Sequence, residues 1–352
     1  MLYLGLDYSK RFSVATIVDG RGRVKKRGKF ANRRAAFEEF LSGLKRVKAV
    51  IEAGRNYHVA AELLEGLVME IKLAHPLKVR AIAEAKIKTD SIDSETLAQL
   101  LRGNLIPEAY FRDSEQRTKQ QALHLRSFWV RQRTRLRNRI HWLIDGQREE
   151  VREGTRQFSD LFGKKGRAWL KGLQLPALAF ESLMDLLDLE QVCTQKIKNS
   201  DLKVKEYFEA DADCRLIDTI PGFGVFLSVL AKVEIGDIER FKSASHLCSY
   251  AGVIPTTRGS GGKIWHGRTT KQGNRYLRWC LVEAAIHSLK DKGELKRFFL
   301  RIRHRKGIKV ARVATARKLC FILYRVLKQK DTYSPYRVFK QSRLRFAPGV
   351  PL

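Results

Sequence analysis

The sequence is poor in acidic residues, cysteine and proline. Asp and Glu number 37 against 69 Lys and Arg in 352 residues, which leaves a formal net charge of +32. The 5 cysteines lie at least 21 residues apart and lack the close pairs of zinc sites, so we expect reduced thiols and no disulfide framework. Only 8 prolines accompany 44% hydrophobic residues, which excludes a mainly disordered basic chain.

Long hydrophobic runs are also absent. The apolar start at Met1–Leu6 stops at Asp7, too early for a signal peptide, and the apolar run at Val225–Ala231 is too short to span a bilayer. We therefore expect a cytoplasmic protein with no membrane partner.

The positive charge is concentrated in the last third of the chain. Residues 1–107 have a net charge of +8, residues 108–215 of +4 and residues 216–352 of +20. A folded surface of this charge is typical of a protein that binds a phosphate polymer, because released counterions favour binding. An anionic membrane is the alternative, and we expect nucleic acid.

The first hundred residues alternate strand-like and helix-like segments. The predicted strands cover 2–6, 12–18, 24–30, 47–51 and 70–74, and the predicted helices cover about 32–44, 58–67 and 91–101. The first three strands form an antiparallel meander because a short turn closes the second strand. The order β-β-β-α-β-α-β-α is that of an α/β ribonuclease H-like fold.

Four carboxylates stand at the ends of these predicted elements. Asp7 ends the first strand, Glu52 ends the fourth, and Asp90 and Asp93 stand three residues apart at a helix start, so both can project from one face. Acids clustered in a basic domain repel one another unless divalent cations bind them, and Mg²⁺ prefers carboxylate, water and phosphate oxygens. Each acid alone could be a turn residue or an acid favoured by a helix dipole. Together they predict a Mg²⁺ site for phosphodiester chemistry.

The middle of the chain, residues 111–212, predicts long helices in a hairpin or coiled coil. Its apolar residues recur at spacings of three, four or seven, namely Leu125, Phe128, Trp129, Leu136, Ile140 and Leu143. Between Leu125 and Leu143 the chain carries six arginines, which are Arg126, Arg131, Arg133, Arg135, Arg137 and Arg139. These arginines either form a solvated face or contact nucleic acid in part.

A glycine-rich segment opens the last part of the chain, residues 213–352, which we expect to be mainly α-helical. Gly222 and Gly224 flank Phe223 just before an apolar helix, a pattern similar to a helix-hairpin-helix. Glycines at a helix N-terminus let backbone N–H groups approach a phosphate. The alternative is a helix cap that packs Phe223 into the core.

A second glycine-rich stretch contains a single serine. Gly259, Gly261 and Gly262 surround Ser260, and small neighbours and cations would let this hydroxyl reach a phosphodiester. The alternative is a flexible turn in a phosphate-binding loop. The hydroxyl of Tyr250 is a weaker candidate, which we expect in the core. No acid interrupts the six basic residues expected to bind nucleic acid, Arg258, Lys263, Arg268, Lys271, Arg275 and Arg278.

Over nearly its whole length, the chain resembles the insertion sequence 110 family of transposases, described as RNA-guided recombinases. Residues 4–7, 51–54 and 88–93 are similar to the D-E-D-D motifs of the family's RuvC-like domain. Residues 252–278 are similar to its transposase domain, with Gly259 where a serine is common. The resemblance implies a RuvC-like domain at 1–110, a helical coiled-coil region at 111–212 and a transposase domain at 213–352.

The resemblance also implies partners and roles for these residues. Ser260 would form a covalent link to DNA, and Asp7, Glu52, Asp90 and Asp93 would hold Mg²⁺. A noncoding bridge RNA would select target and donor DNA, and subunits of a homo-oligomer, a dimer or tetramer, would share the active site. Such a protein would be associated with the nucleoid of a bacterium or archaeon.

Two other functions fit the same residues. In a Holliday-junction resolvase-like nuclease, the four acids would hydrolyse DNA with water, so Ser260→Ala would keep cleavage and no protein–DNA adduct would form. In a non-enzymatic protein that binds RNA or DNA, the acids would be structural, and no metal-dependent cleavage would occur.

Overall fold

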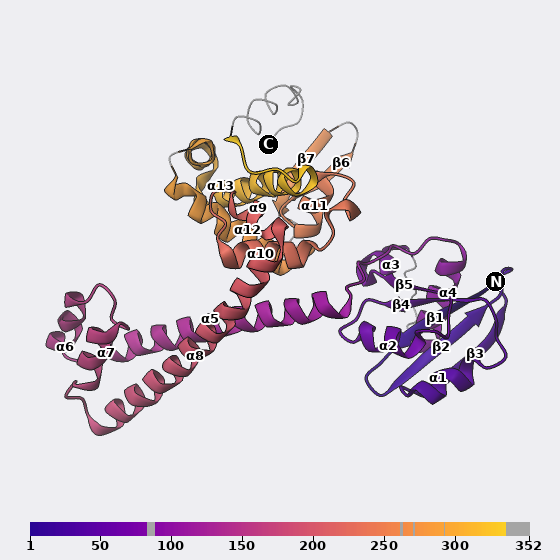
Figure 1. Cartoon of the computed structure of the whole chain (residues 1–352), viewed down its shortest axis with the longest axis horizontal. Coiled ribbons are helices and arrows are strands. Elements are labelled where there is room, and N and C mark those ends of the chain that lie inside the picture. The colour runs from indigo at the N-terminus through magenta and orange to yellow at the C-terminus, as the bar shows by residue number, and fades with distance from the viewer. Residues whose placement is uncertain (83–88, 261–262, 270–271, 292, 336–352) are drawn as a thin grey trace. The chain divides into compact units, whose positions relative to one another are not determined.

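The computed structural model describes residues 1–82, 89–260, 263–269, 272–291 and 293–335. The chain divides into two compact units, Met1–Asp113 and Ser114–Leu352 (Figure 1). Each unit is built around its own hydrophobic core.

The N-terminal unit contains a five-stranded mixed sheet. Its strands are β1 (Leu2–Tyr8), β2 (Phe12–Val18), β3 (Val24–Ala31), β4 (Val47–Glu52) and β5 (Glu70–Ala74). They lie in the order β3-β2-β1-β4-β5, with β1 to β3 antiparallel and β4 and β5 parallel to β1. The predicted order of strands and the α/β fold class are therefore confirmed, and the structure adds one short helix, Pro76–Ile82, that the sequence pattern does not predict.

Helices cover both faces of this sheet. The unit's helices are α1 (Arg34–Leu41), α2 (Tyr57–Leu64), α3 (Pro76–Ile82) and α4 (Asp90–Arg102). Apolar residues of α1 and α2 pack with Leu4 and Leu6 of β1 in one core. Leu97 and Leu101 of α4 pack with Val50 of β4 in a second, smaller core on the opposite face. Alternate residues of β1 and β4 therefore face α1 and α2 or face α4.

Helix α4 lies directly on β1 at Gly5. A Cβ atom at Gly5 would stand 2.0 Å from the carbonyl oxygen of Ser94, so no larger residue fits there. Beside this contact, the buried hydroxyls of Ser94 and Thr16 are hydrogen-bonded at 2.8 Å. Farther along α4, the Gln99 side chain donates a hydrogen bond to the carbonyl of Gly22 (2.7 Å). Gly22 comes shortly after the end of β2, and this end of β2 pairs with the start of β1. The N-terminus of α4 therefore lies at the carboxyl end of β1.

The C-terminal unit begins with two long helices that pack along each other. These are α5 (Ser114–Asp145) and α8 (Ala177–Ala210), and their far ends are joined by α6 (Glu149–Gly154), a 3₁₀ turn (Thr155–Gln157) and α7 (Lys164–Lys171) (Figure 1). This matches the helical hairpin that the apolar spacing predicts. The supercoiling of a coiled coil stays a prediction.

A buried ion-pair cluster joins these long helices. The carboxylate of Glu190 on α8 is fully buried and contacts Arg137 of α5 at 2.8 Å and Arg167 of α7. Burial raises the pKa of Glu190, but hydrogen bonds from Arg167 and Arg137 and their charges outweigh burial and lower it below its ordinary value. Part of the arginine series on α5 is therefore structural.

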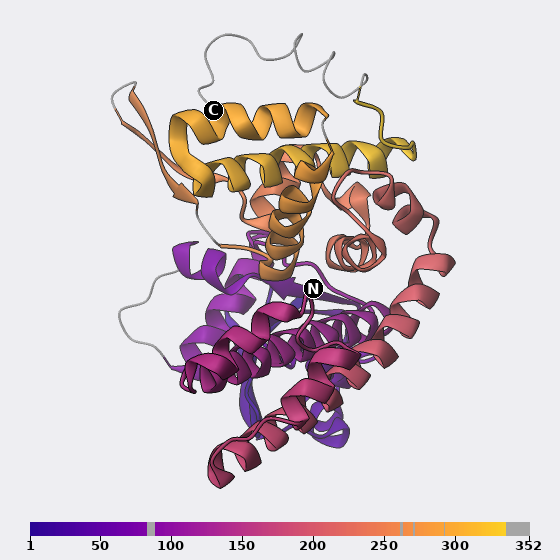
Figure 2. The same cartoon turned by 90° about the vertical axis from the view of Figure 1, so that its left-hand side faces the viewer.

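The rest of the unit is a helical bundle with one hairpin. Its elements are α9 (Ala212–Asp218), α10 (Val225–Ile235), a 3₁₀ turn (Ile238–Arg240), α11 (Ala244–Ala251), β6 (Pro255–Ser260), β7 (Lys263–Thr269), α12 (Arg275–His287), a 3₁₀ turn (Ser288–Lys290) and α13 (Glu294–Gln329). Helix α13 bends at Gly307, where φ is 79°. The two strands extend away from the helices (Figure 2). Among the described residues, no helix is long and apolar enough to cross a membrane.

The close contact at Gly5 predicts a sharp difference between two glycine substitutions. We expect Gly5→Ala to destabilise the N-terminal unit by about 1–3 kcal/mol, because the added methyl group meets the backbone of α4. Gly20→Ala is the control, since nothing lies within 4 Å of its Cβ position. For Gly5→Ala, urea unfolding followed by circular dichroism should shift to lower urea concentration. Unfolding followed by tryptophan fluorescence should not shift, because all 5 tryptophans lie beyond residue 113, in the C-terminal unit. Equal effects of the two variants would contradict the contact.

Candidate active site and nucleic-acid interface

Two of the predicted carboxylates are neighbours at one edge of the sheet. Parallel pairing of β1 with β4 aligns Leu6 with Ile51, so the next residues, Asp7 and Glu52, stand side by side at the carboxyl ends of their strands. Leu6 and Ile51 belong to the core under α1 and α2, so Asp7 and Glu52 face α4. Both acids are half-buried.

The other two carboxylates lie in the first turn of α4. Thr89 caps this helix by accepting a hydrogen bond from the Ile92 amide (3.2 Å), and Asp90 and Asp93 follow the cap. Because the N-terminus of α4 lies at the carboxyl end of β1, both acids belong to the same end of the unit as Asp7. Asp90 is exposed and Asp93 half-buried, and the N-terminal dipole of α4 favours both charges.

An open hollow adjoins this edge of the sheet. Asp90 lines it together with Val14, and Val14 is the register partner of Asp7 on β2. Arg27 and Lys29 of β3 line the same hollow. Acidic and basic side chains therefore meet at an exposed surface that a charged polymer can reach.

The four acids share one end of the unit, but they do not form a closed cluster. Within the part of the chain that the structure describes, no three His, Cys, Asp or Glu side chains lie close enough to hold a metal ion together. Residues 83–88, which precede Asp90, lie outside that part. The donor set itself, all carboxylate oxygen, has the chemistry that a hard divalent cation requires. Convergence of all four acids stays a prediction.

The two glycines predicted to contact phosphate have different surroundings. Gly222 has a φ of +94°, and its Cβ position lies 2.0 Å from the carbonyl of Ala284, so this glycine is required by packing on α12. Phe223 is buried in the core. Gly224 is exposed, precedes the first residue of α10, and has nothing within 4 Å of its Cβ position. Only Gly224 leaves room for a phosphate, and the contact itself stays a prediction.

The serine stands in a β-hairpin rather than in a glycine-rich loop. Ser260 is the last residue of β6, and its backbone pairs with Lys263 at the start of β7. Gly259 pairs with Ile264 in the same ladder. Residues 261 and 262 of the connecting turn lie outside the described residues. Strand pairing therefore extends up to the predicted nucleophile.

The base of this hairpin is closed tightly. The amide of Asn274 donates to the carbonyl of Tyr250 across the base (2.7 Å). Gly252 (φ 68°) and Gly273 (φ 121°) have positive φ, and Cβ atoms there would stand 2.6 Å and 2.4 Å from the carbonyls of Gln272 and Tyr250. Two glycines are thus needed for the chain to leave and return at one point.

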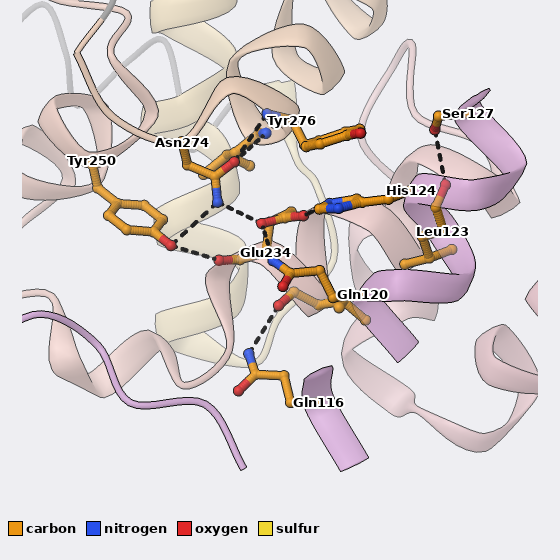
Figure 3. A network of polar contacts seen from close by, with 11 residues as sticks. Gln116, Gln120, Leu123, His124, Ser127, Glu234, Tyr250, Asn274 and Tyr276 are labelled. Carbon is orange, nitrogen blue, oxygen red and sulfur yellow. Dashed lines mark hydrogen bonds and ion pairs between the residues drawn. The ribbon is translucent and has the colours of Figure 1, made fainter. Parts of the chain in front are cut away.

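A buried polar network lies under the hairpin base (Figure 3). The carboxylate of Glu234 on α10 is only 1% exposed and contacts Nε2 of His124 at 2.6 Å. It accepts hydrogen bonds from the side chains of Gln120 (2.9 Å) and Asn274 (2.5 Å). Glu234 is not among the residues predicted from the sequence, although it is the only acid in the apolar helix Val225–Ile235.

The predicted nucleic-acid-binding residues follow the hairpin and the start of α12. The structure describes the backbones of Arg258, Lys263 and Arg268 on β6 and β7. Arg275, the first residue of α12, is exposed, and half-buried Arg278 lies beside Gly252. Lys271 lies outside the described residues. The roles of all six in binding stay predictions.

Comparisons with known proteins match two parts of the chain, and the first match extends past the N-terminal unit into α5. A family model for DEDD transposases of the IS110 type matches residues 4–147, and a model described as the transposase IS116/IS110/IS902 family matches residues 214–300. The chain belongs to the IS110 family of transposases. It is therefore a transposase of the kind that cuts and recombines DNA, as the resemblance implies.

Relatives of the transposase are similar over almost the whole chain. A probable family 20 transposase of Pseudomonas aeruginosa is 24% identical over 346 residues, which cover 94% of this chain and 98% of the relative. The transposase for insertion sequence element IS1111A of Coxiella burnetii is 24% identical over 345 residues, covering 94% and 90%. The first family match contains all four predicted acids and the second contains Ser260.

The contrast between Gly222 and Gly224 predicts opposite consequences of the same substitution. Gly222→Ala should lower the thermal midpoint by several degrees, because the methyl group strains a positive φ and meets α12. Gly224→Ala should leave the midpoint within about 1 °C and weaken DNA binding several-fold, because a methyl group would obstruct an approaching phosphate. Scanning calorimetry and a DNA-binding titration measure both. Unchanged DNA affinity of Gly224→Ala would leave this turn only a packing role.

Proposed function

We propose that this transposase cleaves and rejoins DNA through a covalent phosphoserine at Ser260, with Mg²⁺ held by Asp7, Glu52, Asp90 and Asp93. The observation that carries the proposal is the setting of Ser260. It is the last paired residue of a hairpin with a closed base, in a segment that matches the IS110 family, and four acids share one end of the other unit. A nucleophile must reach a phosphodiester from a defined position, and a supported strand end provides one.

The cleavage step is a transesterification. The Oγ of Ser260 attacks a backbone phosphorus and forms a P–O bond, while the bond from phosphorus to the 3′ oxygen breaks. The proton of the serine hydroxyl is lost as Oγ attacks, and the departing 3′ oxygen takes up a proton to become a hydroxyl. Attack by a 3′-hydroxyl of a second strand reverses the step and releases Ser260. No external energy source is needed, because one phosphodiester is exchanged for another.

The carboxylates of the N-terminal unit support this chemistry. DEDD transposases are typically metal-dependent. Asp7 and Glu52 lie next to each other on rigid central strands, and Asp90 and Asp93 project from the start of a helix packed on β1. Bound divalent cations would polarise the phosphodiester and neutralise its developing charge.

The partners that we propose are target DNA, donor DNA and a noncoding bridge RNA that selects both, at the nucleoid of the cell. The positive charge of the chain supports a protein surface that binds more nucleic acid than a single DNA duplex. Helix α13 contains a single acid, Glu294, and all residues from Arg303 to Val310 are exposed around its bend. On α5, Arg131 and Arg135 are exposed, whereas Arg126 and Arg137 form ion pairs with α8.

We also propose that the transposase acts as a homo-oligomer, a dimer or tetramer, in which the acids and Ser260 can come from different subunits. The two predicted groups of catalytic residues belong to different compact units. The long α5–α8 hairpin carries exposed apolar residues, including Leu189 and Val192 on α8, that a second copy could cover.

A denaturing gel with labelled junction DNA tests the proposed chemistry. The wild-type protein with Mg²⁺ should give a covalent protein–DNA band, and Ser260→Ala should reduce that band by on the order of 10³-fold or more, because the attacking oxygen is missing. EDTA or Asp90→Asn should also abolish it while DNA binding is retained. Ser249→Ala, an exposed serine on α11, is the matched control. Metal-dependent cleavage that survives Ser260→Ala would show a nuclease that uses water.

A further inference from the structure

We propose that Glu234 is a positioning residue for strand transfer, because its buried carboxylate fixes the base of the hairpin that carries Ser260. This inference rests on the proposed role of Ser260. Glu234 itself lies near the end of α10 and belongs to neither strand of the hairpin. Its effect on the hairpin is carried by the side chains that surround it.

The first link runs from Glu234 to the exit of the hairpin. Asn274 follows β7 and caps α12, since its side-chain oxygen accepts hydrogen bonds from the amides of Tyr276 (3.0 Å) and Leu277 (2.9 Å). Its side-chain amide donates to Oε2 of Glu234 at 2.5 Å. Both ends of the Asn274 side chain are therefore engaged, which determines where the chain enters α12.

The second link runs from Glu234 to the entry of the hairpin. The hydroxyl of Tyr250, at the end of α11, donates to the backbone carbonyl of Glu234 (3.2 Å) and accepts from the side-chain amide of Asn274 (3.2 Å). The backbone of Asn274 donates to the carbonyl of Tyr250 (2.7 Å). Entry and exit are thus bonded to each other and to the same glutamate (Figure 3).

The third link holds Glu234 in place from α5. His124 contacts Oε1 of Glu234 at 2.6 Å, and its ring stacks on Tyr276 with centroids 3.4 Å apart and planes 9° apart. Gln120 donates to Oε2 at 2.9 Å, and Gln116 donates to the carbonyl of Val233 at 2.9 Å. A carboxylate only accepts hydrogen bonds, so Nε2 of His124 carries the proton in this contact.

This arrangement explains why an acid stands in an apolar helix. Among the described residues, three side-chain donors converge on the two carboxylate oxygens of Glu234, and neither an apolar residue nor a neutral amide can accept from all three. A glutamine at position 234 would replace one accepting oxygen by an NH₂ group, and this donor would face one of the three donor side chains. The expected consequence is a hairpin base that opens more often, with Ser260 less often in an attacking position.

Hydrogen exchange and adduct formation together test this role. In Glu234→Gln we expect faster amide exchange confined to residues 250–277, DNA affinity within about twofold of wild type, and covalent adduct formation slower by on the order of 10- to 100-fold. Glu190→Gln is the matched control, because Glu190 is equally buried and bonded to two arginines in the same unit, away from the hairpin. It should leave exchange in residues 250–277 and the adduct rate at their wild-type values.

A second substitution restores the hydrogen bond between the side chains at positions 234 and 274, with donor and acceptor exchanged. In Glu234→Gln with Asn274→Asp, the aspartate still caps α12 and accepts from the new amide, so we expect recovery of most of the adduct rate. Should Glu234→Gln not fold, Asn274→Ser keeps a cap but removes the side-chain amide that donates to Glu234 and to the Tyr250 hydroxyl, and it should show the same local exchange and slower adduct formation.

The results separate failure of this inference from failure of the proposed function. Absence of an adduct in the wild-type protein would refute the proposed role of Ser260, and exchange in residues 250–277 would still report on the hairpin base. A wild-type adduct rate in Glu234→Gln, or faster exchange spread evenly over the C-terminal unit, would overturn the positioning role of Glu234.

Discussion

The base of the hairpin in the C-terminal unit is built around one buried carboxylate, that of Glu234. Glu234 joins α5 and α10 to the ends of the hairpin, at the point where the chain leaves α11 and enters α12. Burial of an acid is unfavourable unless its oxygens are hydrogen-bonded, and within the described part of the chain three side chains donate to the oxygens of Glu234. The same hydrogen bonds that stabilise the buried charge also join the two ends of the hairpin that carries Ser260.

The N-terminal unit depends on a contact of a different kind. Gly5 lets α4 approach β1 closely, and the direction of α4 brings Asp90 and Asp93 to the end of the sheet where Asp7 and Glu52 stand. Close packing places these acids within one region without bringing three of them together in the described residues. DNA phosphates would supply further metal ligands at such an open site, as expected for a metal ion that binds the protein and its DNA substrate together.

Much of this architecture follows from local sequence patterns, and the rest depends on long-range contacts. Short apolar runs, the second of them closed by a turn, predict the strands, and parallel pairing then makes Asp7 and Glu52 neighbours. The hairpin was not predicted, because Gly259, Gly261 and Gly262 are strong turn signals while cross-strand pairing determines the strand. The Glu234 network joins residues 110 positions apart in the sequence, so no local pattern reveals it.

The position of the protein–DNA bond tests the account most directly. The adduct formed with Mg²⁺ and junction DNA can be digested with protease and nuclease, and the modified peptide located by tandem mass spectrometry. We expect one deoxynucleotide phosphate on Ser260. A phosphate on Tyr250, Thr256 or Thr257 instead would contradict it, because Tyr250 belongs to α11 and the two threonines come early in β6, whereas Ser260 ends this strand.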